Sequence, residues 1–205
     1  MFYQNAEFSP CLRFGDIIEG FQLFKPCYQS TLSNKLDLSL SVESIAWFSI
    51  LTPCCSIEKN IISICPLRYI SPRYFDNPYL VEDLTNINRI MLPQNSLAPE
   101  IWETLPPEEI DKRIGAGPSY FFINYFIYAE DIRLSKYTLT HPSSKEKIET
   151  GFYAIDFKEA FPVSSTDFTR GKPYPKILEL SKRSREELRN KVAFFYGRPP
   201  EEDRI

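Results

Sequence analysis

The sequence has little of what several classes of protein require. Its 205 residues include one histidine, seven glycines and no apolar run long enough to cross a bilayer, and the formal net charge is −3. The missing run argues against a membrane span, and the negative charge argues against a uniformly basic surface for nucleic acid. With few glycines and 15% aromatic residues, the composition is that of neither collagen nor a disordered chain. We expect a single globular domain.

Signals for secretion and for disulfide bonds are also missing. Residues 1–7 lack the basic and apolar regions of a signal peptide, and the five cysteines include no Cys-x-x-Cys pair. An odd number of cysteines without a signal peptide argues against a disulfide framework, so we expect a cytoplasmic location. The adjacent Cys54 and Cys55 are expected to be small buried side chains at a strand end, with a reactive thiol as the alternative.

Histidine-based catalysis and the common cofactor sites have no support in the sequence. The single histidine, His141, precedes a polar, turn-like stretch, and no second histidine is available as the base for a nucleophilic cysteine. The glycine-rich phosphate and dinucleotide motifs are missing, and no residue spacing specifies a metal geometry. We therefore predict no cofactor and no metal, and we assign no catalytic residue.

Short apolar and aromatic segments indicate a protein made mainly of β-strands. These segments are residues 17–24, 36–40, 45–51, 61–65, 120–128 and 151–157, with weaker signals at 160–163 and 177–180. The nearly continuous apolar run at 45–51 is typical of a strand that is buried on both faces. The short polar stretch 56–60 predicts a hairpin between that strand and the next.

A proline-rich segment at about 71–118 interrupts the strand pattern. Short helices fit around 81–91, 99–104 and 107–114, the last of which begins with proline and two acidic residues. Residues 76–131 contain ten acidic and three basic side chains. The segment is therefore expected to be an acidic helical insertion.

The end of the chain carries the clearest helix pattern. Ser184 and Glu187 have the spacing of a capping box, and the apolar residues Leu188 and Val192 follow at helical spacing. These features predict a helix at 185–196. Residues 170–198 contain nine basic and three acidic side chains, so the acidic insertion is opposed by a basic C-terminal region.

Several short motifs resemble one family of proteins. They are Phe14-Gly15-Asp16-Ile17-Ile18, Ile50-Leu51-Thr52-Pro53, Ile64-Cys65-Pro66-Leu67, Gly151-Phe152-Tyr153-Ala154-Ile155-Asp156, and Leu180-Ser181 before Arg185-Glu186-Glu187-Leu188. Their order and spacing resemble the PemK/MazF-like toxins, which share an SH3-like barrel. The resemblance covers residues 11–70 and 120–198. It implies one domain, residues 1–205, that is mainly β with α: a small SH3-like β-barrel, an acidic helical insertion and a C-terminal helix.

The resemblance extends to the family's chemistry only in part. These toxins are ribonucleases that need no metal and use an arginine at the reacting phosphate. The corresponding position falls near Ser44 or Ala46, and neither residue is basic. Without a guanidinium there, the charge that develops in the transition state lacks its stabiliser. Arg68 and Tyr69, on another strand, form the alternative RNA site.

The remaining signals point to contact with a protein. Aromatic and arginine side chains in loops are common at interfaces, and a patch of one charge attracts a partner of the opposite charge. The candidate protein-binding residues are Arg73, Tyr74, Phe75, Tyr79, Glu108, Glu109, Asp111, Arg185 and Arg189. The alternative interpretation is internal: the rings attach the insertion to the barrel, and the two charged regions neutralise each other.

Three functions follow from these signals. The first is a non-catalytic, protein-binding module or regulatory accessory subunit within a larger complex, without membrane contact. The resemblance to toxins suggests a prokaryotic stress or phage-defence system for that complex, including CRISPR-associated ones. The second is a PemK/MazF-like RNA endonuclease with its site relocated to Arg68 and Tyr69. The third is a cysteine-dependent enzyme that uses Cys54 or Cys55.

Overall fold

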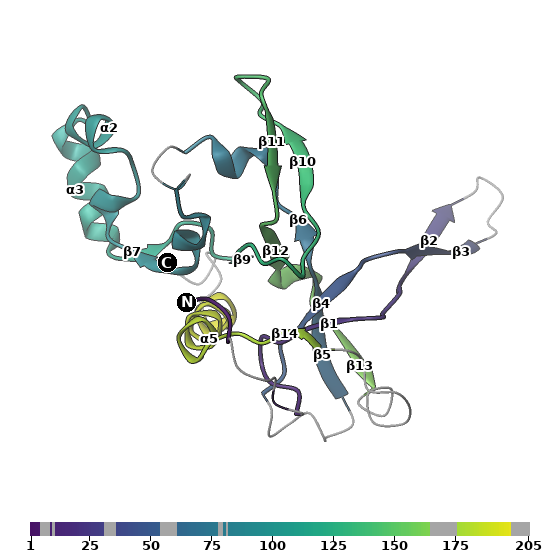
Figure 1. Ribbon diagram of the computed structural model, residues 1–205. Helices are drawn as coiled ribbons and strands as arrows, with labels where there is room; N and C mark the ends of the chain where they lie inside the picture. The colour runs from purple at the N-terminus through teal and green to yellow at the C-terminus, as the bar shows by residue number, and fades with distance from the viewer. Residues whose placement is uncertain are drawn as a thin grey trace.

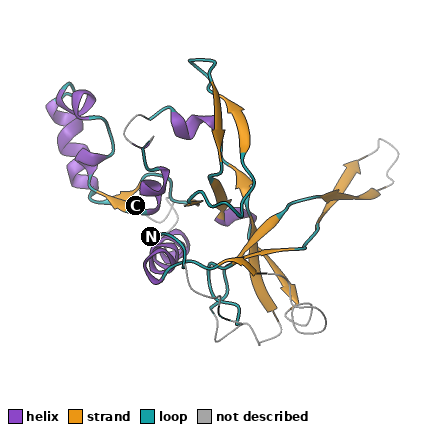
Figure 2. Cartoon of the chain, in the orientation of Figure 1, coloured by secondary structure: helices purple, strands orange, loops and turns teal. Residues whose placement is uncertain are grey.

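The computed structural model describes residues 1–4, 9, 11–30, 36–53, 61–77, 80, 82–164 and 176–197, of which 24–30 and 36–40 are described by their backbone. The protein is mainly β with α-helices. Figure 2 shows the three α-helices of the described residues on one side of the molecule and most of the strands on the other.

The largest sheet has five antiparallel strands among the described residues. Their order is β13 (Phe161–Ser164), β5 (Ile61–Pro66), β4 (Trp47–Ile50), β1 (Ile17–Glu19) and β14 (Lys176–Leu178). All four residues of β4 are buried, as the apolar run predicts, because one apolar cluster covers each face of the strand. The predicted pairing of β4 with β5 is confirmed.

A smaller sheet lies beside the first. It consists of β6 (Arg68–Tyr69), β12 (Tyr153–Asp156) and β9 (Tyr125–Tyr128). The chain passes from one sheet to the other through β5 and β6, and a hairpin of β10 (Tyr137–Thr140) and β11 (Lys147–Thr150) extends from the smaller sheet (Figure 1). The main core fills the space between the two sheets and the last helix.

The predicted closed barrel is not found among the described residues. Closure requires the two edge strands of a sheet to hydrogen-bond to each other. Here the edges of the five-stranded sheet are β13 and β14, and neither pairs with a further strand in the described part of the chain. The sheet is open, and the aromatic core is covered by the smaller sheet and a helix.

Gly20 divides the strand that was predicted at 17–24. Its φ of +96° is unsuited to a continuing strand, so β1 ends at Glu19 and β2 (Leu23–Ser30) begins after the bend. β2 pairs over eight residues with β3 (Leu36–Glu43), and the two form a ribbon that projects from the body in Figure 1.

The insertion begins with 3₁₀ turns packed on the smaller sheet. The first is η2 (Pro72–Phe75) and the second is η3 (Leu84–Asn88), which replaces the helix predicted around 81–91. Four residues of η3 are buried, and Asn88 accepts from the backbone N–H of Ile127 and donates to its carbonyl at 2.7 Å each. These two hydrogen bonds hold the start of the insertion against β9.

The rest of the insertion is a helical arm, which we define as residues 90–120. It begins and ends in a two-residue ladder between β7 (Ile90–Met91) and β8 (Ser119–Tyr120). Between them lie η4 (Pro93–Asn95), α2 (Pro99–Glu103) and α3 (Pro107–Ala116), which agree with the helices predicted at 99–104 and 107–114. The strand predicted at 120–128 is divided into β8 and β9 by a turn.

The last helix, α5 (Lys182–Gly197), begins before the predicted cap. Ser181 caps it: the Oγ of Ser181 accepts from the backbone N–H of Ser184 at 3.2 Å, so Ser184 lies within the first turn. Leu188 is fully buried, and Val192 and Phe195 pack beside it on the main core, as the spacing predicts. A short turn, η5 (Phe157–Glu159), lies under the end of α5, where the rings of Phe157 and Phe195 are 5.5 Å apart.

A buried charge network joins the two ends of the chain. The Nζ of Lys176 donates to Asp16 at 2.8 Å and to Glu179 at 3.1 Å. Burial raises the pKa of Asp16 to about 6, and hydrogen bonds from Lys176 oppose that shift. The backbone N–H of Arg13 also donates to Asp16, so the carboxylate closes the turn before β1. The network therefore holds β14 against β1.

Candidate functional site

The helical arm exposes large apolar side chains. Neither α2 nor α3, both fully described, contains a buried residue. Ile90, Leu92, Ile101 and Ile114 are each between 46% and 58% exposed. Because monomeric proteins normally keep such side chains apart on the surface, their concentration in one short segment is typical of a contact surface.

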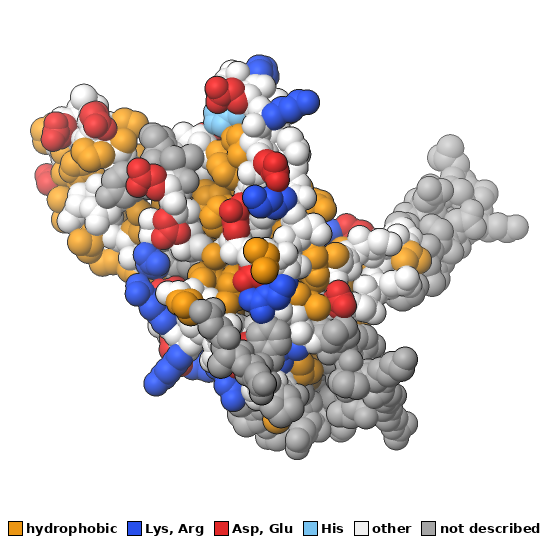
Figure 3. Space-filling model, viewed as in Figure 1, with side chains coloured by type: hydrophobic (Ala, Val, Ile, Leu, Met, Phe, Trp, Pro, Cys, Tyr) orange, Lys and Arg blue, Asp and Glu red, His pale blue; other side chains and the backbone are white. Residues whose placement is uncertain are grey.

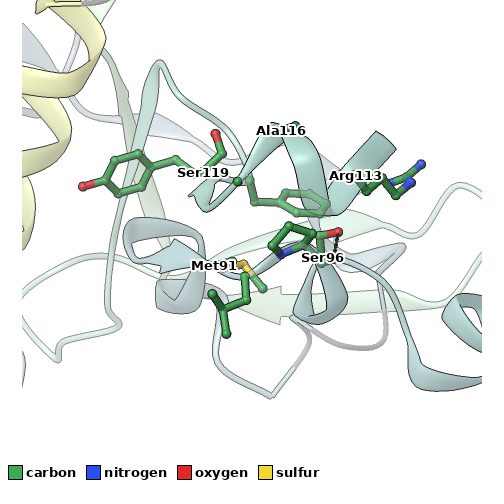
Figure 4. A pocket seen from close by; sticks show the side chains of 10 residues that line it. Met91, Ser96, Arg113, Ala116 and Ser119 are labelled. Atoms are coloured by element: carbon green, nitrogen blue, oxygen red, sulfur yellow. Dashed lines mark hydrogen bonds between the residues drawn. The ribbon is translucent and has the colours of Figure 1, made fainter. Parts of the chain in front are cut away.

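A small pocket lies at the base of the arm. Its volume is about 210 Å³, and most of its lining is apolar. In Figure 4, Met91 and Ser96 lie on one side of it, and Ala116 and Ser119 lie on the other. Arg113 lies at one end and is bound by Glu109, Nε to Oε1, at 2.9 Å. The pocket is large enough for one apolar side chain.

The acidic candidates lie on the same arm. Glu108, Glu109 and Asp111 are in the first half of α3, where the positive end of the helix dipole stabilises them. Figure 3 shows acidic side chains beside apolar ones at this end of the molecule, with the basic side chains concentrated lower, near α5. The arm therefore combines an apolar surface with acidic neighbours.

The aromatic candidates beside the arm face inward. Tyr74 is buried, and its ring packs 4.8 Å from that of Phe122 and 5.9 Å from that of Tyr125. Phe75 is partly buried against the same cluster, while Arg73, in the last turn of η2, is exposed. Tyr74 and Phe75 attach the insertion to the smaller sheet. Tyr79 is outside the described residues.

The two candidate arginines of α5 take part in internal contacts. Arg185 is 13% exposed in its side chain and donates to Glu179 at 3.2 Å and to the carbonyl of Leu180 at 2.9 Å. Arg189 pairs with Glu186 at 2.6 Å and lies 5.8 Å from the ring centre of Phe14. Arg185 thus belongs to the buried charge network, and Arg189 remains half exposed.

Helix α5 also carries a buried lysine. Lys191 has no exposed surface, donates through Nζ to the carbonyl of Ile87, and lies 5.1 Å from the ring centre of Tyr120. Burial lowers its pKa from 10.5 to about 7. Beside it, Arg89 lies 3.5 Å from Glu187. The basic helix and the start of the acidic insertion therefore lie together, but this ion pair joins a base of the insertion to an acid of the helix, the reverse of the pairing that the internal interpretation expected.

A second candidate site surrounds Arg68. Two carboxylates bind its guanidinium: Glu43 contacts both Nη atoms, and Glu159 accepts from Nε at 2.7 Å. These ion pairs hold the pKa of Arg68 above its usual value. The guanidinium lies at a cavity of about 270 Å³ whose lining includes Trp47, Tyr69 and Ser44. The alternative RNA site, Arg68 and Tyr69, is thus a real pocket.

Aromatic rings form one wall of the Arg68 pocket. Tyr69 is 65% exposed, and its ring centre lies 4.4 Å from that of Tyr137 and 5.3 Å from that of Tyr153. Trp47 packs edge-on against Tyr153 at 5.1 Å. The hydroxyl groups of Tyr137 and Tyr153 donate to backbone carbonyls, which fixes both rings.

Sequence reasoning missed most of this pocket. The sequence pointed to Arg68 and Tyr69, but only the fold brings the segment 43–47 and Tyr153 to them, with Glu159 beside the pocket. Ser44 and Ala46, which the sequence analysis also named, line the cavity.

Cys65 and His141 do not form a nucleophilic pair, and Cys11, whose side chain is also described, is exposed. Cys65 is buried, donates to the carbonyl of Asp156 at 3.0 Å, and has its pKa raised by burial. His141 lies in a turn, where it contacts Asp76 at 3.1 Å and accepts from the backbone N–H of Ser144. Cys54 and Cys55 are outside the described residues, so a role for either stays a prediction.

Neither a metal cluster nor a membrane helix is present in the described residues. They contain no group of three or more His, Cys, Asp or Glu side chains placed to hold a metal ion. None of the described helices is long and apolar enough to cross a membrane. Comparison of the chain with family models, with curated proteins and with solved structures finds no match.

Proposed function

We propose that this protein is a non-catalytic binding module whose protein partner docks on the helical arm. The observation that carries the proposal is the exposure of Ile90, Leu92, Ile101 and Ile114 on a segment whose two α-helices contain no buried residue. A segment that buries so little within its own chain gains stability by burying that surface against another molecule.

The chemistry of the arm favours one kind of partner. Ile110 and Ile114 lie one turn apart on α3, with Glu108 and Asp111 nearby on the same helix. An apolar stripe beside acidic side chains favours a basic amphipathic helix, whose lysine or arginine residues meet the carboxylates. One large apolar side chain of the partner would fill the pocket between Met91 and Ala116, which supplies the buried anchor of the interface.

The wider setting of this module is inferred from the motif resemblance alone. It relates the chain to PemK/MazF-like toxins by short motifs alone, because the described residues form no closed barrel, and it suggests a prokaryotic stress or phage-defence complex in the cytoplasm. A nuclease site at Arg68 has less support, since Glu43 and Glu159 already bind the guanidinium that a phosphate would require.

The test compares two variants of the full chain in a pull-down from the native host. Ile114→Glu places a charge within the proposed surface, and Ile132→Glu places the same charge at a fully exposed position outside the arm. We expect one stoichiometric protein that survives ribonuclease treatment, is bound at least tenfold more weakly by Ile114→Glu, and is retained by Ile132→Glu.

Cross-linking then identifies the partner segment that touches the arm. A basic amphipathic helix at that place supports the proposal. Equal capture by both variants would contradict the arm as the docking surface, and recovery of RNA alone would contradict the protein-binding function.

A further inference from the structure

We propose that the Arg68 pocket is a binding site for a guanidinium group, supplied by an arginine side chain of a protein or by a small free molecule. The pocket is separate from the helical arm, because its lining comes from residues 43–47, 67–69 and Tyr153. The inference therefore goes beyond the proposed docking function and does not depend on it.

The first argument is the set of charged groups at the pocket: Glu43 and Arg68 line it, and Glu159 lies beside it on the same guanidinium. Glu43 and Glu159 approach the single guanidinium of Arg68 from two sides, and both carboxylates are more than a third exposed. Each carboxylate has about four lone-pair positions for hydrogen bonds, so a donor from a ligand can share the carboxylates with Arg68. A phosphate would instead be repelled by both. The pocket therefore favours a cation.

The second argument is the exposed ring of Tyr69. Its contacts with Tyr137 and Tyr153 hold the ring in place while leaving most of its surface open. A cation over such a face gains from the negative charge of the ring's π system. A flat guanidinium stacks on the ring and directs paired N–H groups at a carboxylate, which a tetrahedral ammonium cannot do.

The third argument is size. A cavity of about 270 Å³ is smaller than the sites that hold drug-sized ligands, and it suits one extended side chain or a small metabolite. Both sources of the group share the same recognition chemistry, so the experiment has to separate them.

Titration of the full chain with three probes tests the site. N-acetylarginine amide represents an arginine within a protein, free arginine represents a small molecule, and N-acetyllysine amide carries the charge on an ammonium. We expect binding of the arginine probes and at least severalfold weaker binding of the lysine probe. Tighter binding of the amide assigns a protein source, and tighter binding of free arginine assigns a small molecule.

Variants of the pocket residues then test whether the arginine probes bind at this pocket. Tyr69→Ala removes an exposed ring and is expected to weaken binding about tenfold with little effect on folding. Glu159→Gln keeps the shape and is expected to weaken it as well, whereas Ile132→Ala leaves it unchanged. The proposal is overturned if neither arginine probe binds at millimolar concentration, or if Tyr69→Ala binds as tightly as the natural chain. Single-stranded RNA that competes for the same site and loses affinity in Tyr69→Ala would also overturn it.

Discussion

The five-stranded sheet and the helical arm belong to one chain but are stabilised in different ways. In β4 every residue is buried, with Trp47 in one apolar cluster and Phe48 and Ile50 in the other. In α3 the Ile114 side chain remains 55% exposed, and no residue is buried. The sheet supplies its own core, whereas the arm leaves its apolar surface exposed.

The ion pairs of the two regions also differ in burial. Lys176 joins Asp16 and Glu179 in a network that water hardly reaches. The arm has the pair Glu109–Arg113, which is more than a third exposed and therefore worth only a few tenths of a kcal/mol. The comparison teaches that the sheet is stabilised by its own buried contacts and the arm is not, and the following variants break or sharpen it.

The largest effect is expected inside the sheet. Phe48→Ala removes a fully buried ring that packs against Phe21 and Phe161, and we expect a loss of about 3–5 kcal/mol in the free energy of unfolding. Urea unfolding followed by circular dichroism measures it. A loss below about 1 kcal/mol would show that this core is looser than the structure indicates.

The next largest loss of stability is expected when either of two glycines is replaced by alanine. Gly15 and Gly117 both have positive φ, +84° and +74°, but a Cβ at Gly15 would lie 2.5 Å from Leu180 while a Cβ at Gly117 would meet nothing within 4 Å. Gly117 also has a ψ of −177°, a backbone conformation almost exclusive to glycine, so Gly117→Ala, in the arm, is expected to cost only the backbone strain, about 1–3 kcal/mol. Gly15→Ala adds overpacking of roughly 1–3 kcal/mol, measured in the same unfolding experiment. Equal losses would contradict the close packing of α5 on this turn.

The free energy of unfolding is expected to depend on pH through Lys191, at the junction between α5 and the insertion. An unfolded lysine keeps its proton up to about pH 10.5, whereas burial makes folded Lys191 release it near pH 7. Between these values the unfolded state binds more protons, so the folded state of the natural chain gains stability as pH rises from 7 to 10.

Lys191→Met is expected to remove this gain and to stabilise the protein below pH 7 by about 1 kcal/mol, after the lost hydrogen bond to Ile87 is counted. Chemical unfolding at a series of pH values tests both effects. A Lys191→Met curve parallel to that of the natural chain would show that the lysine is charged when folded.

The smallest effect on stability is expected in the arm. Ile114→Ala should change the free energy of unfolding by no more than about 0.5 kcal/mol, because the side chain is already half exposed. Hydrogen exchange should likewise show weak protection of the α3 amides beside strong protection in β4. Strong protection throughout the arm of the isolated chain would mean that the arm is stable without a partner.

Local sequence patterns were enough to predict individual strands and helices, but not whether the sheet closes into a barrel. The apolar run at 45–51 and the proline and acidic residues before Ile110 gave β4 and α3 correctly, since both signals act within a few residues. The helix cap was assigned to Ser184 instead of Ser181, because both serines precede suitable residues and only the packing of α5 selects one.

The pairing of strands within the sheet and the formation of the Arg68 pocket both depend on contacts between residues that are far apart in the sequence. Ile17 pairs with Leu178, and Arg68 pairs with Glu43 and Glu159, across separations that no local pattern encodes. The inward-facing ring of Tyr74 was ambiguous for the same reason: an aromatic residue in a proline-rich turn suits a surface contact and an internal one equally well.

The position of β1 in the middle of the large sheet has a consequence for synthesis. β1 is translated long before one of its two neighbours, β14, which is the last strand of the described residues, and Leu188 of α5 packs on the same core. The nascent chain must therefore carry an incomplete sheet with an open edge until β14 has emerged. Its contacts are long in sequence, so folding should be slow and should benefit from a chaperone that shields β1 and β4 until β14 arrives.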